Sequence, residues 1–471
     1  MGSGRIVFLG VTALAIYLGY KIKCALGPPP LVTLENDTYW GPGEPNNAWK
    51  ENFLITPLNI TVPDEVLEYL KWRLDTHRPM VPPLEGVQQQ YGMNTKLLED
   101  VIQYWKTEYN WTERQQYLNK YPQYKINIQG LQIHVVHRNS YADGYKVVPI
   151  LLLHGWPGSV REFYEMIPYL TNPQEGRKVI FEVLAPYIPG YGFSQAAAKP
   201  GLGAAQMAVL FKNMMEKLGY DKFYVQGGDF GAIILQHMAV MYPDSILGFH
   251  SNMCLVHTPK ALLRLMLGTI FPSWYVRPDH YDRVYPLREK VFEFYLRESG
   301  YFHLQATKPD TLGVGMNDSP MGIAAYILEK FVTGTNISWQ LREDGGLKEA
   351  FSYRDLLDNI MIYWLTQSAT TSFRLYSETF NKAHTELGFM RQPITVPTAC
   401  ARFKYDFYTA DGVLGEIFTN LLQLTDHEGG HFAAFQLPKV LADDIYDAVE
   451  KFEEYNKKRK SIMNGDVWKN A

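Results

Sequence analysis

Cysteine is scarce in this chain. Only three occur among 471 residues, Cys24, Cys254 and Cys400, which is too few for the disulfide framework of a small secreted domain. No cluster of cysteine and histidine has the spacing of a metal site. Hydrophobic residues make up 46% of the sequence, so the length is ample for one large core.

The chain also lacks a marked excess of charge. Its 45 basic and 49 acidic residues leave a formal net charge of −4, which gives no electrostatic reason to expect nucleic acid as a partner. No phosphate-binding loop is present either, since Gly227-Gly228 is not followed by the lysine and hydroxyl residue of such a loop. The sequence therefore implies neither a cofactor nor a metal.

A hydrophobic run of about 20 residues, the length of a membrane-spanning helix, is also missing. The nearest candidate is Ile6–Tyr20, 15 uncharged and mainly apolar residues with basic residues on both sides. Snorkelling of Lys21 and Lys23 would extend it to Leu26. A cleaved signal peptide is the alternative, but lysines directly after the run fit a cleavage site poorly. We expect a retained N-terminal membrane anchor over residues 1–27.

What the chain does contain is a turn with the form of a nucleophile elbow. The sequence from Gly227 to Gly231 reads Gly-Gly-Asp-Phe-Gly, between a short apolar strand, Phe223–Gln226, and a helical stretch, Ala232–Met241. The outer glycines permit a sharp strand-to-helix turn. The central Asp229 is ionised at neutral pH and needs no base to attack a saturated carbon. Glycine and aspartate also form ordinary turns, so this interpretation depends on its context.

The context is that of an α/β-hydrolase. Val147–Leu153 is a continuous apolar strand, typical of a parallel sheet buried on both faces, and the loop His154–Ser159 follows it. In this fold the loop and the residue after the nucleophile supply the two N–H donors of the oxyanion hole, here Trp156 and Phe230. A further buried strand, Val179–Ala185, continues the alternation expected of a doubly wound sheet.

The order of catalytic residues in this fold, nucleophile, acid and then histidine, narrows the choice of base among 12 histidines. His431 follows an apolar strand, Leu421–Leu424, and precedes an amphipathic C-terminal helix, where the general base belongs. His427 is the rival, but its neighbours Asp426 and Glu428 indicate a solvated surface residue. We predict His431, since an ordinary histidine pKa of about 6.5 suits a base near neutrality.

The acid that orients this histidine should follow the preceding strand, Ile394–Phe403. Asp406 is the first carboxylate beyond it, and Asp411 and Glu416 lie further along a loop-to-helix segment. A carboxylate bonded to the far ring nitrogen fixes the tautomer and stabilises the imidazolium. We favour Asp406 and keep the other two as alternatives.

The rest of the chain is arranged around this core. Residues 28–145 form an N-terminal region, with a hairpin predicted to turn at Gln129-Gly130. Residues 146–253 and 386–471 are predicted to form the two parts of the α/β-hydrolase core. Between them, residues 254–385 lose the strand pattern and become helical and rich in aromatic residues, as expected of a lid.

With these motifs the chain resembles the animal microsomal epoxide hydrolases, and within them the arthropod juvenile-hormone branch. The matching stretches are residues 39–43, 154–159, 188–194, 226–231, 298–301, 307–311 and 429–435. Two positions depart from the family pattern. Phe230 stands where tryptophan is usual, which changes the wall of the pocket. Asp406 stands where mammalian members typically have glutamate, so its shorter arm requires a shift of the backbone.

The resemblance implies hydrolysis of a lipophilic epoxide to a vicinal diol, with water as the second reactant. Asp229 would attack a ring carbon and form an alkyl-enzyme ester. His431, oriented by Asp406, would activate the water that cleaves this ester. Two lid tyrosines, placed by the motifs at Tyr301 and Tyr376, would donate a proton to the opening ring. The resemblance also implies an endoplasmic-reticulum membrane location, with the catalytic body in the cytosol.

Two other functions share part of this pattern. A haloalkane dehalogenase has the same nucleophile, but a halide leaving group needs N–H donors rather than the phenols of Tyr301 and Tyr376. A catalytically inactive carrier of hydrophobic ligands would not need five intact catalytic positions. The sequence favours an epoxide hydrolase with an α/β-hydrolase fold, a mainly helical lid, an N-terminal wrapping region and an anchor. It leaves open whether the substrate is juvenile hormone, a xenobiotic epoxide or a lipid epoxide.

Overall fold

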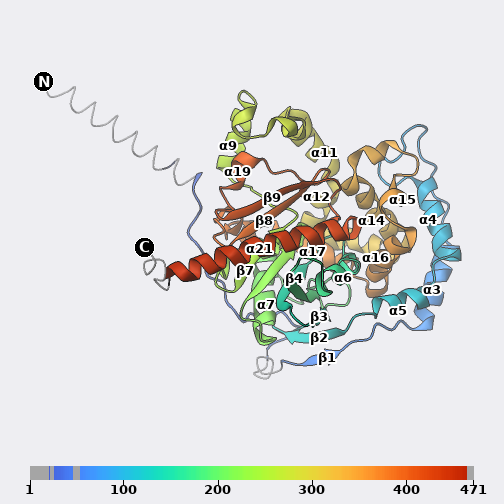
Figure 1. The fold of residues 1–471 in the computed structure, drawn as a ribbon. Coiled ribbons are helices and arrows are strands. Elements are labelled where there is room, and N and C mark those ends of the chain that lie inside the picture. The colour runs from blue at the N-terminus through green and yellow to red at the C-terminus, as the bar shows by residue number, and fades with distance from the viewer. Residues whose placement is uncertain (1–20, 22–25, 46–52, 464–471) are drawn as a thin grey trace.

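The computed structural model of the protein describes residues 21, 26–45 and 53–463, and within them nine strands form one mixed sheet (Figure 1). The strands are β1 Ile55–Pro57, β2 Gln123–Ile128, β3 Leu131–Arg138, β4 Lys146–Leu153, β5 Val179–Pro186, β6 Phe223–Gly227, β7 Ile246–Ser251, β8 Thr398–Phe403 and β9 Leu421–His427. Their order is β1-β2-β3-β5-β4-β6-β7-β8-β9. The strands from β5 to β9 in this order are parallel, and β1, β2 and β3 extend the sheet in antiparallel fashion.

Helices pack against this sheet in two pairs. The short α6 (Ile167–Thr171) contacts α21 (Pro438–Met463), which crosses the front of the sheet in Figure 1. The second pair is α7 (Ala204–Lys217) and α8 (Asp229–Met241). Apolar strands covered in this way match the predicted α/β-hydrolase core. The helix predicted from Ala232 begins three residues earlier, at Asp229 itself.

The segment between β7 and β8 is helical, as predicted. It comprises α9 Pro259–Gly268, α10 Tyr281–Val284, α11 Phe294–Glu298, α12 Gly300–Thr307, α13 Pro309–Asp318, α14 Pro320–Thr335, α15 Leu347–Ala350, α16 Tyr353–Thr366, α17 Ala369–Thr379 and α18 Lys382–Thr385, with the short turns η2 Pro272–Trp274, η3 Pro278–His280, η4 Arg288–Glu293, η5 Ile337–Leu341 and η6 Phe389–Arg391. Within it, α12 and α13 pack against α17, and α14 packs against α16. β8 starts at Thr398 rather than at the predicted Ile394, which forms only an isolated bridge with Phe418.

The N-terminal region packs against this helical segment. Its helices are α3 Asp64–Asp75, α4 Thr95–Thr107 and α5 Trp111–Leu118, and both α3 and α4 contact α14. The hairpin of β2 and β3 turns where predicted, with φ of +49° at Gln129 and +80° at Gly130. The smaller elements η1 Val160–Phe163, α19 Asp411–Leu414 and α20 Ala433–Gln436 lie in loops of the core. The domain limits proposed above remain predictions.

Cys254 and Cys400 form a disulfide, with their Cα atoms 5.9 Å apart. The small number of cysteines argued only against a disulfide framework, and this pair was not foreseen. The two residues are 146 positions apart, but β7 and β8 are paired, with Ser251 opposite Cys400. The sheet therefore brings together two cysteines that the helical insertion separates in sequence.

The predicted anchor, residues 1–27, lies outside the described residues except for Lys21, Leu26 and Gly27. In the part of the chain that the structure describes, no helix is both long and apolar enough to cross a membrane.

A buried ion cluster joins the three parts of the molecule. Asp358 of α16 has no exposed side-chain surface, and it accepts hydrogen bonds from Arg161 of η1 at 2.8 Å and from Arg114 of α5 at 2.7 and 2.9 Å. Arg161 also donates to Asp355 at 2.8 Å and to Glu165 at 2.6 Å. A buried charge costs several kcal/mol when its partner is removed, so each member depends on the others.

We predict that Asp358→Asn lowers the free energy of unfolding by about 3 kcal/mol, because two buried guanidinium groups lose their shared carboxylate. The matched control is Asp318→Asn. Asp318 also binds an arginine, Arg73, through two hydrogen bonds of 3.0 and 3.2 Å, but it is 70% exposed, so a loss below about 1 kcal/mol is expected. Urea unfolding monitored by tryptophan fluorescence measures both. Equal losses in the two variants would contradict the assignment.

Candidate active site

Asp229 stands at the turn between β6 and α8, as the elbow motif predicts. Its φ is +46°, in the left-handed region that only a tight surrounding structure imposes on a residue other than glycine. The glycines around it are required by close approach. A Cβ at Gly231 would lie 2.0 Å from the Leu153 carbonyl oxygen, and one at Gly227 would lie 2.7 Å from the carbonyl carbon of Gly231. The turn is therefore packed directly against the end of β4.

The loop after β4 provides a hydrogen-bond donor to the carboxylate of Asp229. The Trp156 N–H donates to Asp229 Oδ1 at 2.9 Å, and Gly155 lies so close that a Cβ there would be 2.2 Å from the same oxygen. Two side chains of α16 hold the loop: Asn359 donates to the Pro157 carbonyl at 2.7 Å and Tyr363 to the Gly158 carbonyl at 2.8 Å. The Trp156 N–H, which the sequence predicts as an oxyanion donor, therefore binds an oxygen of Asp229.

Phe230, the second predicted oxyanion donor, lies in the first turn of α8. Its side chain is buried, and its ring meets the Tyr376 ring edge-on, with centroids 4.7 Å apart. The aromatic side chain therefore packs against one of the two predicted lid tyrosines. Its N–H as a donor remains a prediction.

His431 lies between two carboxylates. Its Nε2 is 3.5 Å from Asp229 Oδ2, and its Nδ1 is 2.8 Å from Asp406 Oδ1. The shorter arm of Asp406 thus reaches the ring. Burial lowers the pKa of His431, but the two carboxylates outweigh burial and hold this pKa well above its ordinary value of 6.5. The imidazole therefore favours its protonated form in the free enzyme.

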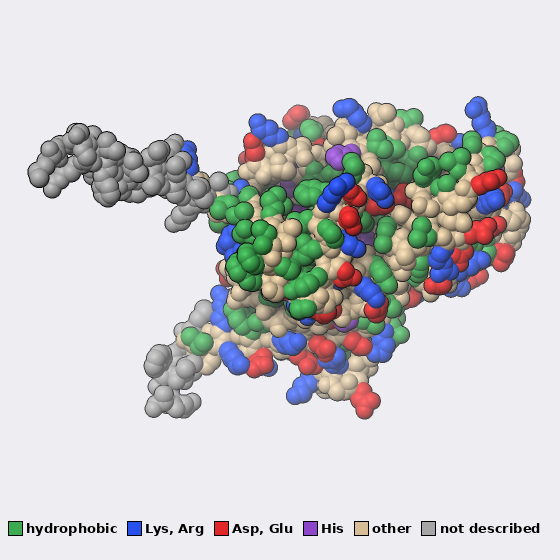
Figure 2. Space-filling model, turned by 90° about the horizontal axis from the view of Figure 1, so that it is seen from above, with side chains coloured by type: hydrophobic (Ala, Val, Ile, Leu, Met, Phe, Trp, Pro, Cys, Tyr) green, Lys and Arg blue, Asp and Glu red, His purple; other side chains and the backbone are tan. Residues whose placement is uncertain are grey.

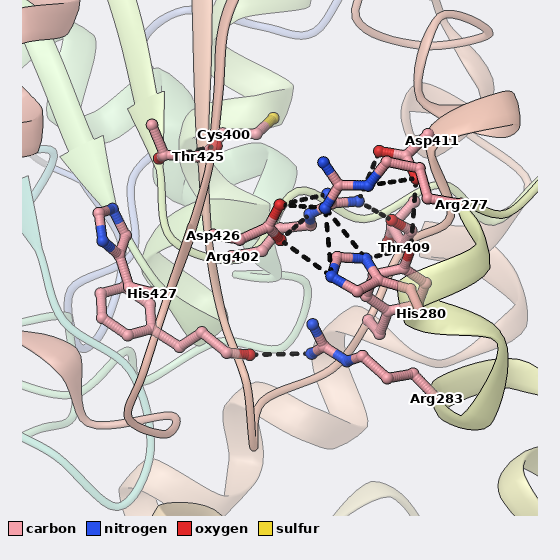
Figure 3. Close-up of polar contacts among 12 residues, drawn as sticks. Arg277, His280, Arg283, Cys400, Arg402, Thr409, Asp411, Thr425, Asp426 and His427 are labelled. Carbon is pink, nitrogen blue, oxygen red and sulfur yellow. Dashed lines mark hydrogen bonds and ion pairs between the residues drawn. The ribbon is translucent and has the colours of Figure 1, made fainter.

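The loop that carries Asp406 is held by side chains of the helical segment. In Figure 3, Arg277, His280 and Arg283 of the helical segment lie beside the ends of β8 and β9, which carry Arg402 and Asp426. Arg402 of β8 donates twice to Asp426 of β9, at 2.9 Å each, and Arg283 donates to the Phe403 carbonyl at 2.9 Å (Figure 3). The position of Asp406 therefore depends on the contact between the helical segment and the sheet.

The alternatives to His431 and Asp406, which are His427, Asp411 and Glu416, contact other side chains. His427 Nε2 bonds Asp444 of α21 at 2.7 Å and is half-buried, so its interpretation as a solvated surface residue was wrong. Asp411 pairs with Arg402 at 3.1 Å, and Glu416 pairs with Arg264 at 2.8 Å. None of the three rivals bonds His431.

The two predicted tyrosines come from different helices, and their rings lie next to each other. Tyr301 of α12 and Tyr376 of α17 have ring centroids 6.1 Å apart at an interplanar angle of 80°. The Trp156 ring stacks on Tyr301 at 5.2 Å and meets Tyr376 edge-on at 6.0 Å. Burial first, and then neighbouring negative charge including that of Asp229, raises the pKa of both phenols above 10, so both keep their protons at neutral pH.

Sequence reasoning missed several residues of this site. Tyr326 and Phe373 contact the Trp156 ring at 5.5 and 6.0 Å, and Phe302 contacts Tyr376 at 5.7 Å. Glu162 of η1 lines the same cavity as Asp229 and His431. Phe302 and Phe373 lie in the motifs that placed the two tyrosines, but no role was predicted for them, and Tyr326 and Glu162 belong to no motif that was used. No group of three His, Cys, Asp or Glu side chains among the described residues forms a metal site.

The comparisons with known proteins agree with this geometry. Residues 55–163 match the family described as "Epoxide hydrolase N terminus", and residues 148–368 match the "alpha/beta hydrolase fold". The fold and the site thus define an epoxide hydrolase of the α/β-hydrolase class.

The relatives narrow the family further. The chain is 47% identical over 466 residues to juvenile hormone epoxide hydrolase 1 of Ctenocephalides felis, covering 98% of each chain. It is 42% identical to epoxide hydrolase 1 of Oryctolagus cuniculus, covering 87% of this chain and 91% of the relative. The crystal structure of juvenile hormone epoxide hydrolase from Bombyx mori matches with a TM-score of 0.87 and 45% identity, covering 90% of this chain and all of that one. The chain belongs to the microsomal epoxide hydrolase family and is an epoxide hydrolase.

We predict that His431→Gln lowers the turnover of an aryl epoxide by about 1,000-fold or more, because a general base typically contributes about 100- to 10,000-fold. His427→Gln should keep turnover within about threefold of wild type, since His427 contacts Asp444 and not Asp229. Steady-state diol formation measures both, with circular dichroism as the check of folding. The reverse pattern would identify His427 as the base.

Proposed function

We propose that this enzyme hydrolyses lipophilic epoxides, with juvenile hormone as its physiological substrate, through an ester on Asp229. The observation that carries this proposal is the surroundings of the Asp229 carboxylate. One oxygen accepts from the Trp156 N–H at 2.9 Å, and the other lies 3.5 Å from His431. A carboxylate with one oxygen held and the other beside a histidine suits attack on carbon followed by attack of water.

In the first step, Asp229 attacks a ring carbon of the epoxide and one carbon–oxygen bond breaks. The departing alkoxide needs a proton or a strong hydrogen bond. Tyr301 and Tyr376 suit this role because their phenols stay protonated at neutral pH and their rings contact the ring of Trp156, whose N–H binds Asp229. A halide would need no such acid, which favours the epoxide over a haloalkane.

In the second step, water attacks the ester carbonyl and His431 takes its proton. Ester formation removes the negative charge of Asp229, one of the two charges that raise the pKa of His431. The remaining influences are burial, which lowers this pKa, and Asp406, which raises it. The pKa of His431 therefore falls once the ester has formed, and the ring becomes a better base at the stage that requires one.

The side chains packed around Tyr301 and Tyr376 support a lipophilic substrate. The side chains around the two tyrosines are aromatic: Trp156, Phe230, Phe302, Tyr326, Phe373 and Phe380. Burial of apolar substrate surface against such walls contributes about 25 cal/mol per Å². The flea and silkworm relatives named as juvenile hormone epoxide hydrolases support a terpenoid epoxide as the substrate.

A substrate panel tests this choice. We expect kcat/KM for juvenile hormone to exceed that for an aryl epoxide by at least about 10-fold, because each additional buried methylene is worth about 0.8 kcal/mol. Asp229→Ala, which lacks the nucleophile, gives the background rate. An aryl or fatty-acid epoxide with an equal or higher kcat/KM would contradict juvenile hormone as the preferred substrate.

We further propose that the enzyme is bound to the endoplasmic-reticulum membrane by residues 1–27, with its catalytic body in the cytosol. The apolar run Ile6–Tyr20 supports the anchor. A second support is an exposed apolar surface on and after α9, each side chain at least 42% exposed: Leu262, Leu263, Met266, Leu267, Ile270, Phe271 and Trp274. Figure 2 shows hydrophobic side chains gathered on the face that carries α9. Such a surface suits contact with lipid. The Cys254–Cys400 disulfide is buried, which shields it from cytosolic thiols.

In microsomes, we expect the full chain to resist alkaline extraction, and trypsin added to sealed vesicles to degrade the body. For the chain lacking residues 1–25, Leu267→Glu should weaken binding to phosphatidylcholine vesicles by about 10-fold, since the burial of one leucine is worth about 2 kcal/mol. Leu84→Glu, at a site 63% exposed in the N-terminal region, is the control and should have no effect. Protection from trypsin would contradict the cytosolic orientation, and equal effects of the two substitutions would contradict the α9 surface.

A further inference from the structure

A small cavity lies beside the nucleophile and the base. Gly158, Glu162, Asp229 and His431 are among its lining residues, and its volume is about 20 Å³. A cavity needs about 10–15 Å³ to hold one water molecule, so this cavity has room for a single water and not for an epoxide substrate. It therefore has the size and the neighbours of a site for the water that cleaves the ester.

Glu162 is the carboxyl of this cavity that the mechanism has not used. Apart from Asp229, it is the only acidic residue among the described residues that line the cavity. Its neighbours Arg161 and Glu165 belong to the Asp358 ion cluster. The backbone N–H of Glu162 donates to the Ser159 carbonyl at 3.1 Å, but its carboxyl makes no hydrogen bond to any described residue. Burial raises the pKa of Glu162 to about 8, so this carboxyl is mostly protonated and neutral at pH 7. An unpartnered polar group costs free energy unless water satisfies it.

The fold makes room for this side chain. A Cβ at Gly158 would lie 2.8 Å from Glu162 Oε1 and 3.3 Å from its Cδ, so any larger residue at position 158 would displace the carboxyl. Gly158 itself is fixed by the hydrogen bond from Tyr363 to its carbonyl, and η1 is capped by Ser159, which accepts from the Arg161 N–H at 3.2 Å. The backbone on both sides of Glu162 is thus held by other contacts.

We propose that Glu162 is a positioning residue for the hydrolytic water. The inference rests on the proposed ester mechanism. The water gives one proton to His431 Nε2 as its oxygen bonds to Cγ of the Asp229 ester. The carbonyl oxygen of the Glu162 carboxyl accepts a hydrogen bond from the second O–H and directs the lone pair at that carbon. The tetrahedral intermediate then expels the diol oxygen, which takes the proton from His431. The second proton of the water stays on the Asp229 carboxyl and is released to solvent, which restores the carboxylate, and solvent returns a proton to the phenol that protonated the ring oxygen. Glu162 gains and loses no proton.

The test separates ester formation from ester hydrolysis. Glu162→Met removes the polar group with little change in volume, and Glu162→Gln keeps a carbonyl acceptor. Single-turnover reactions with excess enzyme and styrene oxide, followed by intrinsic tryptophan fluorescence and by the mass of acid-quenched protein, give both rates. For Glu162→Met we expect ester formation within about twofold of wild type and hydrolysis slower by about 10- to 100-fold, so that the ester accumulates and kcat falls while kcat/KM is kept. Glu162→Gln should keep hydrolysis within about threefold.

Two further variants guard against a merely structural effect. Gly158→Ala pushes the flexible end of Glu162 aside without altering its chemistry, and it should slow hydrolysis in the same selective way. Glu165→Met, one turn away in the Arg161 contact, should leave the ratio of the two rates unchanged. Hydrolysis at the wild-type rate in Glu162→Met, or an equal loss of both steps, would overturn the proposal. Because the wild type still forms the ester in that case, such a result would leave the covalent mechanism standing, whereas the absence of any ester in the wild type would overturn both.

Discussion

The negative charge of Asp229 sets the state of the other groups in the site. It accepts the Trp156 N–H, it acts with Asp406 to raise the pKa of His431 from 3.5 Å away, and it adds to burial in raising the pKa of the two phenols. In the proposed mechanism a bond to carbon cancels that charge, and His431 then loses one of the two carboxylates that raise its pKa. The electrostatics of the free enzyme therefore favour the proposed order of the two chemical steps.

Much of this site could be predicted because it lies in short motifs with local geometry. The glycines around Asp229, the loop of Trp156 and the position of His431 after β9 each follow from a strand that ends in a turn. The two alternatives to Asp406, Asp411 and Glu416, lie in ion pairs with Arg402 and Arg264. The role of a residue could be predicted where the motif that indicates this role lies within a few positions of the residue.

The contacts that could not be predicted are those between distant segments. The Cys254–Cys400 disulfide depends on the pairing of β7 with β8 across 146 residues, and the Asp358 cluster depends on three separate helices. His427 looked solvated because its neighbours are charged, but Asp444 from α21 bonds its ring. The proposed role of Glu162 likewise depends on its place beside Gly158 and the cavity. In each case tertiary packing brings the partner close, and the spacing of residues along the sequence does not reveal this packing.

The central claim is that carbon bonds to an oxygen of Asp229 before water takes part. One turnover in heavy-oxygen water, with enzyme in excess over an aryl epoxide, tests it most directly. We expect the isotope to enter the side-chain carboxyl group of Asp229, while the diol of that first turnover carries only ordinary oxygen. Heavy oxygen in the first diol, with an unlabelled Asp229 peptide, would mean direct attack of water on the ring and would contradict the account.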